Sequence, residues 1–193
     1  MANDQSGFEL PTAVTMKRFQ SELVVAWAVV AVAAVLLAIR YADMPGLIPV
    51  YRDASGHAAV FAPKSAAIVF RIVAMGAAQL GATSVMWMHA RAVRNTGWAK
   101  FWVYAGLAAA AKTLVECVQY AALGTPLARQ PAALWFYAAL LPVLIFFGLA
   151  ANLWRTGQVA TRAATGLKLR TVVALCMWLG LWFGFATLPK WLG

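Results

Sequence analysis

Charged residues are scarce in this chain, and their scarcity decides its physical class. Only 11% of the 193 residues are Asp, Glu, Lys or Arg, whereas 63% are hydrophobic, and the mean hydropathy is +0.74. Soluble domains carry roughly 25% charged residues. The few charges here lie in short islands between apolar runs, which is how integral membrane proteins distribute them. An ordinary soluble globular domain is therefore excluded.

Acidic residues are the rarest charges, with six Asp and Glu against sixteen Lys and Arg, for a net charge of +10. A basic surplus of this size can indicate nucleic-acid binding. Here, however, the basic residues flank hydrophobic runs and form no extended basic face. Their predicted partners are instead the lipid bilayer and its anionic headgroups, at basic loops on the inner side of the membrane.

Cysteine and histidine are also rare, with two of each. Cys117 and Cys176 fall inside apolar runs, where a reduced, buried thiol is expected rather than a disulfide. His57 and His89 are predicted to lie at opposite ends of a membrane span, so they cannot share a metal ion. No Ser-His-Asp grouping, catalytic carboxylate pair or phosphate-binding loop occurs. The sequence predicts no enzyme, no cofactor and no metal site.

Five apolar segments are long enough, or nearly so, to cross a bilayer as helices, which takes about 20 residues each. They are residues 23–39, 66–88, 101–123, 132–153 and 171–188. Backbone groups in lipid must be satisfied within each segment, so the predicted fold class is all-α, a polytopic membrane bundle of about five transmembrane helices. The first segment is predicted to be an uncleaved helix, because acidic residues precede it and no convincing cleavage site follows it.

The distribution of basic residues predicts an orientation with the N-terminus inside. Nine Lys and Arg fall on the inner side and six on the outer side, and the inner loop before the last segment contains no acid. The expected organisation is a cytoplasmic lead (1–20), a two-helix module (21–90) with an outer loop (41–64), and three further spans (91–193) with a basic inner loop (154–170).

The longest polar, turn-rich interruption is residues 43–64, in the outer loop. Pro45, Pro49 and Pro63, with Gly46 and Gly56, exclude a helix there, since proline lacks an N–H and clashes with the preceding turn. Prolines also preset an extended backbone, and glycine permits a turn. The segment is therefore predicted to form a rigid ledge suited to recognition.

The third span contains a polar stripe near its middle. Lys112 and Glu116 are one helical turn apart and can pair, and Gln119 continues the stripe. Gln79 of the second span is expected at a similar depth. One hypothesis is a midplane site for an ion, a proton or a small substrate. The alternative, which the lack of further acids favours, is a neutralised pair that only fixes helix packing.

The outer loop resembles a known module. Pro45, Ile48-Pro49, Gly56 and Lys64 between two spans resemble the N-terminal two-helix module of the SdpI-like bacterial integral membrane family. Tyr51 and Arg52 stand where that family has His and an aromatic residue, and its immunity-type C-terminal half is not recognised here. The resemblance implies a non-enzymatic immunity or signalling protein of the bacterial cytoplasmic membrane that uses the loop for recognition.

Three functions follow, in order of preference. The first is recognition of an extracellular peptide by the outer loop. The second is an accessory structural subunit of a larger membrane protein complex, favoured by apolar residues on all sides of the spans and by the Gly180/Gly184 pair. The third is a small transporter or channel built on the polar stripe. The candidate loop residues are Pro45, Pro49, Tyr51, Arg52, Gly56, His57 and Lys64, and the intramembrane polar residues are Gln79, Lys112, Glu116 and Gln119.

Overall fold

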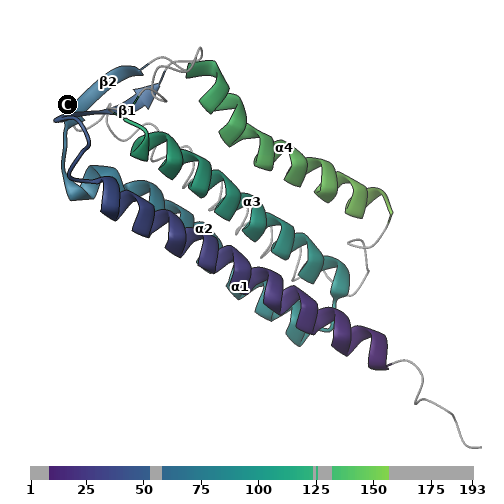
Figure 1. Cartoon of the computed structure of the whole chain (residues 1–193). Helices are drawn as coiled ribbons and strands as arrows, with labels where there is room; N and C mark the ends of the chain where they lie inside the picture. Colours follow the sequence, from purple (N-terminus) through teal and green to yellow (C-terminus); the bar gives the residue numbers. More distant parts are fainter. Residues whose placement is uncertain (1–8, 53–57, 124, 126–131, 157–193) are drawn as a thin grey trace, which may run out of the picture.

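The computed structural model describes residues 9–52, 58–123, 125 and 132–156 (Figure 1). Within these ranges it contains four helices long and apolar enough to cross a membrane and one two-stranded sheet. The elements in chain order are α1 (Glu9–Arg40), β1 (Leu47–Arg52), β2 (Ala58–Pro63), α2 (Ala66–Ala92), α3 (Thr96–Ala121) and α4 (Ala132–Arg155). The chain is a multi-pass helical membrane protein.

Four of the five predicted spans coincide with these helices, while the fifth, residues 171–188, lies outside the described residues. The helices begin where local chemistry favours a start. The side chain of Asn95 accepts a hydrogen bond from the Trp98 N–H at 3.1 Å, so α3 begins five residues before its predicted start. Ser65 caps α2 in the same way, through the Ile68 N–H. Such caps satisfy backbone donors that the first helical turn leaves open.

Helix α1 begins at Glu9, well before the apolar run. Part of the predicted N-terminal lead is therefore helical. Pro11 is compatible with this start, because the N–H groups of a first turn have no partner within the helix. Phe19, two turns further on, is buried in the core. At Phe19 the extension thus packs against the rest of the bundle.

Helix α3 is the centre of the bundle. It contacts α1, α2 and α4, and α1 also contacts α2. Figure 1 shows α3 between α4 and the α1–α2 pair. In its most apolar stretch 61% of the residues are buried, against 17% for α4. The polar side chains that a membrane protein must shield are therefore best placed on α3.

Small residues allow α2 and α3 to approach closely. A Cβ added at Gly76 of α2 would stand 2.1 Å from the Thr113 hydroxyl oxygen of α3. A Cβ added at Gly106 of α3 would stand 3.0 Å from Leu23 and 3.1 Å from Leu80, which is a less close approach. Between membrane helices, where lipid is as apolar as leucine, such close packing is a main source of association.

Helix α4 is the peripheral helix. Its Phe146 ring packs edge-on against Phe101 of α3, with ring centroids 5.3 Å apart. Leu141, Leu144 and Ile145 are exposed on its other side. A surface of this kind suits lipid, and among the described elements α4 packs through the face that contacts α3.

The segment between α1 and α2 contains no helix, as its prolines predict, but it forms a β-hairpin that the sequence did not predict. Strands β1 and β2 are antiparallel, with Pro49 opposite Phe61 and Leu47 opposite Pro63. The Lys64 N–H donates to the Gly46 carbonyl at 2.7 Å, which makes that pair a hydrogen-bonded one. Hydrogen-bonded and non-hydrogen-bonded pairs alternate along such a ladder. Pro49 and Pro63 both fall in non-hydrogen-bonded pairs, where a backbone N–H would point away from the partner strand. The sheet therefore loses no hydrogen bond at either proline.

Candidate functional site

The hairpin is fastened to the helices by a buried hydroxyl group. Tyr120, near the end of α3, donates from its hydroxyl to the Pro49 carbonyl at 2.6 Å. Arg71 of α2 donates to the same hydroxyl oxygen at 3.4 Å. One side chain thus joins β1, α2 and α3.

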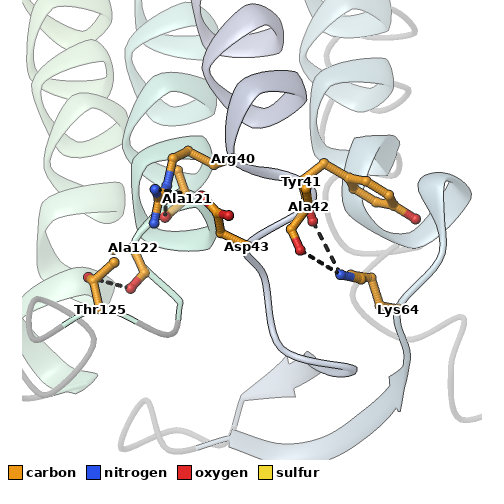
Figure 2. Close-up of polar contacts among 8 residues, drawn as sticks. All are labelled: Arg40, Tyr41, Ala42, Asp43, Lys64, Ala121, Ala122 and Thr125. Carbon is orange, nitrogen blue, oxygen red and sulfur yellow. Dashed lines mark hydrogen bonds and ion pairs between the residues drawn. The ribbon is translucent and has the colours of Figure 1, made fainter.

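Lys64 fastens the hairpin to α1. Its ammonium donates to the carbonyls of Tyr41, Ala42 and Met44 at 3.3, 3.3 and 2.9 Å. It also lies 5.3 Å from the centre of the Tyr41 ring. Figure 2 shows the bonds to Tyr41 and Ala42. A cation at a helix C-terminus satisfies carbonyls that lack helical partners and complements the helix dipole. Lys64, a predicted recognition residue, is thus engaged with the protein's own backbone.

Arg40 connects the ends of α1 and α3. Its Nη1 donates to Asp43 Oδ2 at 2.8 Å, and its Nε donates to the Ala121 carbonyl at 3.4 Å (Figure 2). The Thr125 hydroxyl donates to the Ala122 carbonyl at 2.6 Å and closes the end of α3. Polar bonds therefore tie three chain segments together at this end of the bundle, called here the hairpin end.

Apolar side chains anchor the underside of the hairpin. Ile48 is fully buried and Met44 is 4% exposed. Both belong to a cluster with Leu37 of α1, Ile72 of α2 and Cys117 of α3. Burying a side chain of this size is worth roughly 1.5–3 kcal/mol. The hairpin is held by packing as well as by hydrogen bonds.

The opposite side of the hairpin is exposed and largely apolar. Leu47 is 59% exposed and Phe61 is 55% exposed. Their alternation with the buried Ile48 follows from the two faces of a strand. An exposed apolar surface held on a fastened backbone is the arrangement that a recognition surface requires.

The predicted loop residues have different surroundings. Pro45 is exposed before β1, whereas Pro49 is buried and bonded to Tyr120. Tyr51 and Arg52 belong to β1. Gly56 and His57 lie outside the described residues. The hairpin end therefore contains the predicted loop, but the Pro49 carbonyl and the Lys64 ammonium bond to the protein itself and fix the position of the hairpin.

The polar stripe on α3 forms the ion pair that its spacing predicts. Lys112 Nζ lies 2.7 Å from Glu116 Oε2, with the two side chains 2% and 23% exposed. Glu116 stands only five residues before the end of α3, or about 8 Å at 1.5 Å per residue. The pair is thus closer to the hairpin than the predicted middle of the span. Gln119 and Gln79 are also buried, the latter fully.

The stripe and the hairpin, predicted as separate sites, lie at the same end of the molecule. Along α3 the polar residues run from Lys112 through Glu116 and Gln119 to Tyr120, which touches the hairpin. The sequence pointed to the stripe but not to the contact between Tyr120 and Pro49, which lie 71 residues apart. No local pattern could pair them.

The described residues include no group of three His, Cys, Asp or Glu side chains placed to hold a metal ion. No family model, curated protein or solved structure matches this chain.

Proposed function

We propose that this chain is a non-enzymatic recognition protein that binds an extracellular peptide on the exposed face of the β1–β2 hairpin. In this proposal it spans a bacterial cytoplasmic membrane with its N-terminus inside and the hairpin outside. The observation that carries the proposal is the buried bond from Tyr120 to Pro49. It converts a proline-rich connection into a platform with a defined position on the bundle.

A fastened platform favours binding for an energetic reason. Ordering a flexible loop on binding consumes part of the interaction energy, and preorganisation removes that loss. Loops held by a rigid scaffold accordingly carry much of the binding function of proteins. Leu47 and Phe61 offer apolar contact area. The expected ligand is therefore a peptide with apolar side chains.

Site-specific photocrosslinking tests this proposal. A photoreactive amino acid replaces Leu47, and a matched variant carries it at Leu144, which faces outward from α4. After irradiation in the native membrane, we expect a peptide adduct at position 47 and lipid adducts at position 144. Lipid adducts at both positions would contradict recognition by the hairpin.

The same experiment addresses the accessory-subunit alternative, which one observation favours. Helix α4 packs on α3 and leaves a broad apolar surface. Protein adducts at position 144, absent at position 47, would favour a structural subunit of a larger membrane complex. The transporter alternative has less support, because a closed pair with Lys112 only 2% exposed matches internal neutralisation.

A further inference from the structure

Within the described part of the chain, the edge of β2 that faces away from β1 has no strand paired with it at Phe61. Residues 46 and 64 form a hydrogen-bonded pair, so alternation makes Pro49 and Phe61 a non-hydrogen-bonded pair. In such a pair the N–H and C=O groups of both residues point away from the partner strand. The Pro49 carbonyl points away from β2, since it accepts a hydrogen bond from the Tyr120 hydroxyl. The backbone groups of Phe61 therefore point in the opposite direction, out of the hairpin.

The described residues provide neither hydrogen bonds nor charges that protect this edge. Among the described residues, no backbone hydrogen bond outside the helices and strands reaches Phe61. Strand β2 has the sequence AAVFAP and contains no charged residue. Natural edge strands are commonly guarded by lysine, by proline or by a covering element. Pro63 guards one end of β2 only.

We propose that a second copy of this chain occupies the open edge, with the two β2 strands antiparallel across a two-fold axis at Phe61. Each Phe61 N–H would then donate to the Phe61 carbonyl of the other copy. The two hairpins would form one four-stranded sheet. This pairing uses the strand edge, whereas peptide recognition uses the exposed face, so it does not rest on the proposed function.

The orientation of the sheet fits this symmetry. Two copies in one membrane share the same direction, so a two-fold axis between them must run along the membrane normal. Ile48 faces the bundle and is fully buried, whereas Leu47 on the other face is exposed. The sheet thus lies across the end of the helices, with its own normal along their direction. A two-fold axis perpendicular to a sheet relates two copies of the same strand edge. It places the two strands side by side and antiparallel.

A second copy is favoured over a soluble peptide as the occupant. Pro63 lacks an N–H, so the edge offers few hydrogen bonds. To form these few hydrogen bonds, a peptide from solution would have to lose its translational and conformational freedom. Two copies in one membrane are already confined to the same plane and share one direction. An uncharged strand also pairs with itself without repulsion between like charges. Facing Phe61 rings would add apolar contact across the axis.

Disulfide crosslinking of the full chain in membranes is the first test. Residues opposite each other in a hydrogen-bonded pair have Cα atoms about 5.5 Å apart, within the range that a disulfide spans. The test uses Phe61→Cys in a background carrying Cys117→Ala and Cys176→Ala, with Leu144→Cys as the matched control. We expect a crosslinked dimer about tenfold more abundant at position 61 than at position 144. Equal yields would overturn the proposal.

A second test separates the backbone from the side chain. Phe61→Pro removes an N–H that β1 does not use, and Phe61→Ala retains it. In lipid nanodiscs we expect Phe61→Pro to abolish the dimer and Phe61→Ala to keep most of it. Equal behaviour of the two variants would refute strand pairing. A monomeric chain whose Phe61 amide is protected from hydrogen exchange would also refute it, and would point to a peptide strand on this edge.

Discussion

The Tyr120 hydroxyl links three elements through two hydrogen bonds. Tyr120→Phe removes both and leaves the buried Pro49 carbonyl without a donor. Losing a buried partner costs about 1–3 kcal/mol. We expect faster hydrogen exchange in residues 44–49 of Tyr120→Phe and a lower unfolding temperature.

The matched control for that variant is Tyr104→Phe. The Lys100 ammonium lies 5.8 Å from the centre of the Tyr104 ring, a cation–π interaction that phenylalanine retains. Exchange in the hairpin should not change in this variant. An equal acceleration in both variants would show that the hairpin is not fastened through Tyr120.

Lys112 and Glu116 form a pair whose two members should be strongly coupled. Removing one partner of a buried ion pair costs about 3–5 kcal/mol, whereas replacing both with neutral groups is much less destabilising. We therefore expect Lys112→Met to lower stability more than the double variant Lys112→Met/Glu116→Gln. Thermal unfolding followed by tryptophan fluorescence measures the difference. Additive losses would mean that the 2.7 Å contact contributes no coupling energy.

Arg94 has a backbone conformation that arginine rarely adopts, with φ at 52°. It follows α2 in a turn where the Asn95 N–H donates to the Ala90 carbonyl and the Arg94 N–H to the Arg91 carbonyl. This bonding pattern normally has glycine at the left-handed position. Arg94→Gly should raise the stability by about 1 kcal/mol. Arg91→Gly, inside α2, should lower it, and the two unfolding temperatures test the opposite signs.

At the scale of elements, α2 and α3 depend on the absence of a side chain at Gly76. An alanine there would clash with Thr113, whose hydroxyl oxygen and Cβ lie 2.1 and 2.9 Å from the added Cβ. We expect Gly76→Ala to destabilise the bundle and Thr113→Ala to rescue it in part. Gly81→Ala is the control, because nothing lies within 4 Å of its added Cβ. A loss of stability at position 81 as large as at position 76 would contradict this packing.

The helices were predictable and the hairpin was not, for physical reasons. Apolar runs bounded by polar residues predict helices because lipid leaves few alternatives. The starts of α1 and α3 differed from the prediction because both helices continue beyond the apolar runs, α3 as far as its Asn95 cap. Pro49 and Pro63 excluded a helix but also argued against a sheet, since only the register places both where no N–H is needed. Within the site, the contact between Lys112 and Glu116 was predictable because the two residues are one helical turn apart. The contact between Tyr120 and Pro49 was not, because the two residues are 71 positions apart in the sequence.

At the scale of the whole molecule, the helices place two chemically different ends on opposite sides of the membrane. The end away from the hairpin carries six described basic residues, Lys17, Arg18, Arg91, Arg94, Lys100 and Arg155, whereas the hairpin end carries four, Arg40, Arg52, Lys64 and Arg71. With that end inside, a membrane-impermeant maleimide added to intact cells should label Leu47→Cys and not Arg155→Cys in a background free of other cysteines. The reverse pattern would invert the orientation and place the hairpin in the cytoplasm.

The position of Tyr120 in the chain also bears on how the protein is made. The ribosome releases α1, the hairpin and α2 before it reaches α3, and the hairpin's fastening hydroxyl belongs to α3. A nascent chain that ends after α2 therefore contains the proline-rich segment without the residue that positions it. Because the hairpin is fastened only when α3 enters the bilayer, we expect a protease that meets the chain earlier to cleave within β1 or β2. We expect the same strands to resist cleavage once α3 is inserted.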